Sequence, residues 1–305
     1  MTKTNQLLRS GAAENYQLGH GSRSWLLFLC VSGLASPVLG LGKAPEGKLL
    51  TVADQRGVAS AEAKQQKGEV PSDRELVQAV RSGSVASVRD LLAKGANVNA
   101  RYELRRTALI EAVIAGHVAV VEELIENSRV DVNAIDKHGA TALWWAARLG
   151  HTKIVHTLLS RPGIDLNRAH PVMGRPLLIE AVARNQPEVV ELILAHPEAH
   201  VNAKDRYSWT ALMLAAYHGR TQLVELLVSR DDLQLNEVNF LGRTALMVAA
   251  EGGYVDIVKI LLTRPGLLPN LRDKMGWTVE RIAAEYHQPG VVEALRELGP
   301  AIVAK

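Results

Sequence analysis

The sequence predicts an all-α solenoid in which short helix pairs stack along one axis. Three observations support this: one pattern recurs with a nearly constant period, each copy starts with a residue suited to capping a helix, and each copy contains two apolar stripes at helical spacing. The period is 34 residues with one step of 35, and the first position of the pattern falls at Thr107, Thr141, Pro176, Thr210, Thr244 and Thr278. Periods in this range are typical of stacked supersecondary units.

The copy that begins at Thr141 shows how the first helix of a unit is encoded. The Thr141 hydroxyl can accept backbone N–H groups that a helix start leaves unpaired. The following segment, ALWWAARL, places small and large apolar side chains on one face that must be buried. Gly150 then provides the left-handed residue that ends a helix. Its equivalents in the other copies are Gly116, Asn185, Gly219, Gly253 and His287.

A second helix and a returning loop complete the unit. Ile154, Val155, Leu158 and Leu159 form an apolar stripe, and the segment Arg161-Pro162-Gly163 ends it. An asparagine then follows an apolar residue, where its side-chain amide can bond to exposed backbone. This asparagine recurs at positions 99, 133, 167, 202 and 236, as Asn99, Asn133, Asn167, Asn202 and Asn236.

These copies resemble the ankyrin-repeat family. They read TALIEAVIAGH, TALWWAARLGH, PLLIEAVARNQ, TALMLAAYHGR, TALMVAAEGGY and TVERIAAEYHQ, and a degenerate first copy begins near Glu75. The resemblance covers residues 73–299, or about seven repeats, and implies stacked helix-turn-helix units with loop or hairpin tips on one side. Alanine replaces the family's usual proline after the capping threonine, and apolar residues such as Trp144 replace its usual histidine. Residues 300–305 are expected to form a C-terminal tail.

The N-terminal 42 residues have the outline of an export signal. Residues 25–42 are almost wholly apolar and follow Lys3, Arg9 and Arg23, with Glu14 as the only acid. The dense apolar core is short for a bilayer span, which favours a cleaved signal peptide with a cut near residues 40–44 over an uncleaved signal anchor. Residues 43–72 read as a flexible spacer because they contain few large apolar side chains.

Charge and motifs argue against several function classes. The chain has 35 basic and 32 acidic residues, or 32 against 31 once the N-terminal 42 are removed, and no basic stripe follows the repeats, so nucleic acid is not an expected partner. No nucleophile elbow or phosphate-binding loop occurs. His196 and His200 have the spacing of two metal ligands on a helix, but Pro197 places them in a loop. We therefore predict no catalytic residue, no metal and no cofactor.

The resemblance implies that loop tips and the ends of the first helices line one concave face that binds a protein. Six of the thirteen aromatic residues fall at such positions in the last three copies. Aromatic and arginine side chains are enriched at interface centres. An alternative is that Trp209 and Trp277 only cover the neighbouring repeat. The predicted partner-binding residues are Arg206, Tyr207, Trp209, Tyr217, His218, Phe240, Arg243, Trp277 and Tyr286.

The sequence thus predicts a monomeric, exported, non-enzymatic scaffold that binds another protein. Its location would be periplasmic or secreted, or membrane-tethered through residues 25–42 if the signal stays uncleaved. The alternatives left open are an accessory or protective subunit of an envelope enzyme and a secreted effector that acts on a host protein.

Overall fold

A computed structural model of the protein describes residues 71–171 and 174–303. The predicted signal and nearly all of the predicted spacer lie outside the described residues. So do Val172 and Met173, near one loop tip, and the last two residues of the chain.

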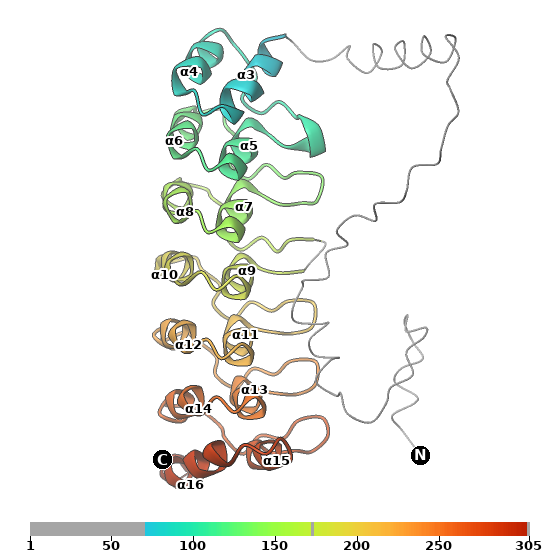
Figure 1. The fold of residues 1–305 in the computed structure, drawn as a ribbon, viewed down its shortest axis with the longest axis vertical. Helices are drawn as coiled ribbons and strands as arrows, with labels where there is room; N and C mark the ends of the chain where they lie inside the picture. The colour runs from blue at the N-terminus through green and yellow to red at the C-terminus, as the bar shows by residue number, and fades with distance from the viewer. Residues whose placement is uncertain (1–70, 172–173, 304–305) are drawn as a thin grey trace, which may run out of the picture. The chain divides into compact units, whose positions relative to one another are not determined.

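The described residues form seven helix pairs that stack in two layers, as Figure 1 shows. The first helix of each pair lies in the inner layer, on the side where the loop tips project. The inner helices are α3 (Pro71–Arg81), α5 (Ala108–Ala115), α7 (Ala142–Leu149), α9 (Leu177–Ala183), α11 (Ala211–Tyr217), α13 (Ala245–Gly252) and α15 (Val279–Glu285). The outer helices are α4 (Val85–Ala93), α6 (Val118–Glu126), α8 (Thr152–Leu159), α10 (Pro187–Ala195), α12 (Thr221–Val228), α14 (Val255–Leu262) and α16 (Pro289–Val303). A short 3-10 turn, η1 (Glu103–Arg105), lies in one tip.

The predicted helix ends are confirmed. Thr141 Oγ1 accepts the backbone N–H of Trp144 at 3.1 Å, and the threonines at four equivalent positions cap their helices in the same way. Pro176 has no side-chain oxygen and makes no such bond. Gly150 has a φ of 72°, and the non-glycine equivalents Asn185 and His287 also adopt left-handed backbone. The helix boundaries therefore follow from local residue chemistry.

The recurring asparagines connect each repeat to the next. Asn133 Nδ2 donates to Gly163 O at 2.8 Å, and its Oδ1 accepts the N–H of Asp165 at 2.8 Å. The same pair of bonds recurs at Asn99, Asn167, Asn202 and Asn236. The predicted contact with backbone is thus confirmed, and its partner is the equivalent loop of the following repeat.

The core runs continuously along the stack. Each helix packs on its partner in the pair and on its equivalents in the adjacent repeats. All residues of 177–182, 211–216 and 245–250 are buried, because the inner helices are covered on both sides along the stack. Within the ranges that the structure describes, none of the helices combines the length and apolar character needed to cross a bilayer.

The two ends of the array differ slightly from the predicted boundaries. Helix α3 begins at Pro71, inside the segment predicted as spacer. Helix α16 continues to Val303, so residues 300–303 extend the last helix instead of forming a separate tail.

Candidate protein-binding face

The loop tips and the C-terminal ends of the inner helices form one surface, which we call the inner face. Each tip joins an outer helix to the inner helix of the next repeat. In four tips an aspartate or asparagine five positions before the capping threonine holds the loop: Asp205 Oδ1, for example, accepts the N–H groups of Tyr207 at 2.8 Å and Trp209 at 2.9 Å. The other three residues of this kind are Asp136, Asn239 and Asp273.

Sequence reasoning missed these four tip residues, although a signal was present. Asp205, Asn239 and Asp273 repeat at the same 34-residue spacing as the capping threonines. Short polar side chains that bond to backbone two and four residues later are typical of tight loops. Backbone bonds also join neighbouring tips, from Phe240 N–H to Tyr207 O at 3.1 Å and from Lys274 N–H to Leu241 O at 3.0 Å. The tips are therefore fixed relative to one another before any partner binds.

Three apolar side chains stand exposed on consecutive tips, and we call them the tip row. Tyr207 is 37% exposed, Phe240 is 39% exposed and Met275 is 61% exposed. The rings of Tyr207 and Phe240 are 6.1 Å apart between centroids, in a tilted arrangement. Both residues were among the predicted partner-binding residues, and within that set they form the one pair of neighbouring rings that are both exposed. Arg206, beside Tyr207, is also exposed.

Both tip tryptophans lie inside the array. Trp209 is 2% exposed and packs edge-on against Tyr217, with ring centroids 5.6 Å apart. Trp277 is buried, and the guanidinium of Arg281 lies 4.8 Å from its ring centroid. The expectation that these rings project toward a partner is therefore corrected, because both rings are buried. The sequence alternative had them cover the neighbouring repeat, and the contacts described above are with the inner helix of their own repeat.

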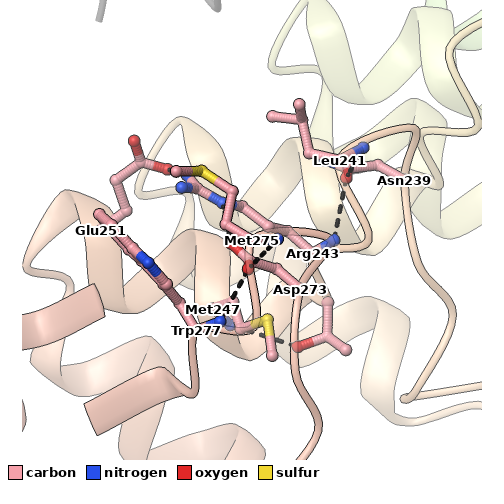
Figure 2. A network of polar contacts seen from close by, with 9 residues as sticks. Asn239, Leu241, Arg243, Met247, Glu251, Asp273, Met275 and Trp277 are labelled. Atoms are coloured by element: carbon pink, nitrogen blue, oxygen red, sulfur yellow. Dashed lines mark hydrogen bonds and ion pairs between the residues drawn. The ribbon is translucent and has the colours of Figure 1, made fainter. Parts of the chain in front are cut away.

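Arg243 is also buried and serves the contact between the last two repeats. Its Nη1 donates to Glu251 Oε2, and its Nε donates to Asp273 Oδ2 at 3.3 Å, an arrangement that Figure 2 shows. Burial is the largest single influence and lowers the pKa of Arg243, but the charges and hydrogen bonds of Glu251 and Tyr286 together outweigh it, so the pKa is raised. The predicted role of Arg243 in partner contact is thus replaced by a structural ion pair.

The remaining predicted residues lie half-buried at the ends of the inner helices. Tyr217 and His218 have ring centroids 5.1 Å apart at the end of α11. Burial, and then the nearby positive charges of Arg220 and Arg175, lower the pKa of His218. Burial, and then the charge of Glu251, raise the pKa of both Tyr217 and Tyr286. At neutral pH these side chains are uncharged, and each offers a polar edge beside an apolar ring.

Carboxylates on or near the inner helices form ion pairs that the sequence analysis did not identify. Glu111 pairs with Arg81 and Arg106, Glu180 with three arginines, and Glu251 with Arg243. No group of three or more potential metal ligands occurs among the described residues. His196 and His200 lie beyond the end of α10, in the loop where the sequence places them.

The comparisons with known proteins agree with this architecture. A family described as ankyrin repeats in three copies matches residues 76–170, 178–273 and 232–305. The crystal structure of the ankyrin repeat domain of Bcl-3, described as a unique member of the IkappaB protein family, is 26% identical at a TM-score of 0.66 and covers 75% of this chain and 99% of its own. The human ASB11 ankyrin repeat domain is 28% identical at a TM-score of 0.57 and covers 75% of this chain and 97% of its own. No curated protein matches the chain.

The family match extends over more than half of the chain, and the capped helix pairs, the left-handed helix ends and the asparagine-linked loops recur through the same residues. The chain therefore belongs to the ankyrin-repeat family.

Proposed function

We propose that this protein is an exported, non-enzymatic scaffold that binds a protein partner through its inner face. Ankyrin-repeat domains are generally protein-interaction scaffolds. The observation that carries the proposal is the tip row: Tyr207, Phe240 and Met275 are exposed on consecutive tips that hydrogen bonds hold in fixed positions. Large apolar side chains held in place lose little conformational entropy on binding, which is what interface hot spots require.

The arrangement of the inner face supports recognition in preference to catalysis. Its buried carboxylates are paired with arginines, and its aspartates accept backbone N–H groups in the tips. Such groups are occupied in maintaining the fold. The half-buried rings of Tyr217 and Tyr286 add amphipathic surface beside the tip row, as is common at protein interfaces.

A capture experiment tests the binding role. Full-length protein and its Tyr207→Ala/Phe240→Ala double variant would be cross-linked to proteins from the native source cells and their medium, and captured proteins would be quantified by mass spectrometry. At least one protein should be captured about tenfold less by the double variant, in the range of a hot-spot loss. Leu268→Ala is the matched control, because Leu268 is exposed and apolar but lies in the part of the connection after α14 that bonds to Asn236, not at the turn that carries Met275. Equal capture by the double variant and the wild type would overturn the proposal.

Export is tested separately. The apolar length of residues 25–42, behind a basic N-terminal stretch, supports a cleaved signal. Protein isolated from its native source should begin near Lys43, and intact-mass measurement checks this. Recovery of soluble full-length chain with Met1 to Gly42 attached would contradict export.

A further inference from the structure

Ion-pair networks on the inner layer differ in their balance of charge. Near the N-terminal end, Arg81 and Arg106 face the two carboxylates of Glu103 and Glu111. Near the C-terminal end, Arg243 faces the two carboxylates of Glu251 and Asp273 (Figure 2). The first network is therefore neutral and the last carries an excess of negative charge.

The network in the middle of the array has the opposite balance, and we call it the central cluster. Arg148, Arg175 and Arg184 all surround the single carboxylate of Glu180. Arg148 Nη1 lies 2.8 Å and Arg184 Nε 3.0 Å from Glu180 Oε1, and Arg175 Nη1 lies 3.6 Å from Oε2. Three positive charges against one negative charge leave a local excess of two.

Nearby groups reduce this excess but do not remove it. Asp205 lies close enough to Arg175 and Arg206 to interact with both, which adds one negative and one positive charge. Asp136 acts on His170 together with Glu180 and Arg148, and its negative charge leaves a local excess of one. The mutual repulsion is visible at Arg148: burial lowers its pKa, Glu180 opposes that shift, and the charges of Arg184 and Arg175 lower it further. The central cluster thus carries positive charge that its own carboxylates do not neutralise.

The cluster is both pre-formed and accessible. The side chain of Glu180 is 0% exposed, and its carboxylate holds the arginines in place through ion pairs. The side chains of Arg148 and Arg184 are 21% and 32% exposed. The Arg148 guanidinium also lies 5.1 Å from the ring centroid of Trp144, a position typical of cation–π contact. Each guanidinium has five N–H donors, and Arg148 and Arg184 each give one hydrogen bond to Glu180. Their remaining N–H groups are not used by that carboxylate.

We propose that the central cluster binds the carboxylate side chains of an acidic segment in the protein partner. This inference rests on the proposed function and names the chemistry of the partner. Arginine forks match carboxylates in geometry as well as charge, and arginines already held in position lose little entropy when they bind. Arg206 precedes Tyr207 in the same tip, and Arg206 and Arg175 both act on Asp205, so the acidic segment would adjoin the tip row.

The surroundings of the cluster favour a peptide over a nucleic acid. Proteins bind the phosphate backbone of a nucleic acid with a row of basic side chains that extends along several nucleotides. Here the positive excess is confined to one place, between a neutral network and an acidic one. A short acidic segment fits this distribution because its charge is also local.

Fluorescence anisotropy with two labelled peptides tests the inference. The probe is a short peptide of alternating glutamate and serine, and its partner has glutamine in place of glutamate. Full-length protein should bind the glutamate peptide about tenfold more tightly, which corresponds to one charge-assisted contact or more. Binding should weaken as salt is raised, because the contact is ionic and partly exposed.

Matched variants localise the binding. Arg184→Gln leaves two arginines on Glu180 and should weaken binding of the glutamate peptide about fivefold or more, as should Arg148→Gln. The control Arg89→Gln also removes one positive charge, but from an exposed side chain on outer helix α4, and should change affinity by less than about twofold. Melting curves of each variant would show that the array remains folded.

Three outcomes would overturn the inference: equal affinity for the two peptides, equal loss in Arg89→Gln and Arg184→Gln, or displacement of the glutamate peptide by oligothymidylate at lower concentration than by unlabelled peptide. The last outcome would indicate a nucleic-acid site. The peptide experiment and the capture experiment can fail independently of each other. If the tip-row variant still loses its captured protein while the peptides bind equally, only the acidic partner is rejected.

Discussion

At the scale of single residues, Gly150 tests how strictly the helix ends are specified. Its φ of 72° is strained for any residue with a side chain, and a Cβ there would lie 2.6 Å from Gln186 Oε1. Gly150→Val is expected to lower the free energy of unfolding by about 1–2 kcal/mol, because the Cβ of a β-branched residue clashes with the backbone in the left-handed conformation. Urea denaturation measures the change.

Asn185 provides the matched control because it occupies the equivalent position with a φ of 55°. Asn185→Gly removes a side chain from left-handed backbone and should leave the denaturation midpoint unchanged or slightly higher. If both substitutions shift the midpoint equally, the left-handed assignment does not explain the glycine.

Trp209 and Tyr207, two positions apart in one tip, should respond differently to truncation. Trp209→Ala leaves a cavity beneath the tip and is expected to cost about 3–5 kcal/mol of stability. Tyr207→Ala removes an exposed ring and should cost less than about 1 kcal/mol while weakening partner capture. Thermal denaturation separates the two variants, and a stable Trp209→Ala protein would contradict the packing role.

At the scale of elements, the asparagine bonds determine how firmly one repeat holds the next. Asn133→Ala removes both bonds to the following loop and should cost about 2 kcal/mol, at about 1 kcal/mol for each bond. Asn270 occupies the equivalent position in the last repeat and is exposed, and the described residues contain no equivalent loop of a following repeat for it to bond. Asn270→Ala should therefore change stability by less than about 0.5 kcal/mol. Equal effects in chemical denaturation would show that the inter-repeat bonds contribute nothing.

At the scale of the array, cooperativity should depend on where a repeat is damaged. Among the described residues, each helix packs mainly on its partner and on the equivalent helices of adjacent repeats, so stability is a sum of units and interfaces. Ile193→Ala in α10 creates a cavity in an internal repeat and should broaden the urea transition, because the flanking repeats can then unfold separately. Leu295→Ala in α16 damages the last repeat and should mainly fray that end. Transitions of equal steepness for both variants and wild type would contradict this prediction.

Features that depend on residues close in the chain could be predicted from the sequence. Thr141 caps the segment that follows it, Gly150 ends that segment, and the apolar stripes lie within a few residues of each other. These are local backbone preferences, repeated with a fixed period, and they were enough to specify the ankyrin-repeat fold. Asn133 was recognised as a backbone-bonding residue for the same reason, although its partner in the next repeat was not.

The tertiary structure decided which side chains reach solvent. Tyr207 and Trp209 are both large aromatic residues of one tip, yet Tyr207 is exposed and Trp209 is buried. The Asp205 side chain bonds to the N–H of Trp209, and the Trp209 ring packs against Tyr217 of the inner helix α11. The central cluster was likewise hidden from the sequence, since Arg148 comes from the repeat before the one that holds Arg175 and Glu180, and their contact depends on how the two repeats stack. The contact between Arg148 and Glu180 joins residues roughly one period apart, and local preferences do not encode contacts of that separation.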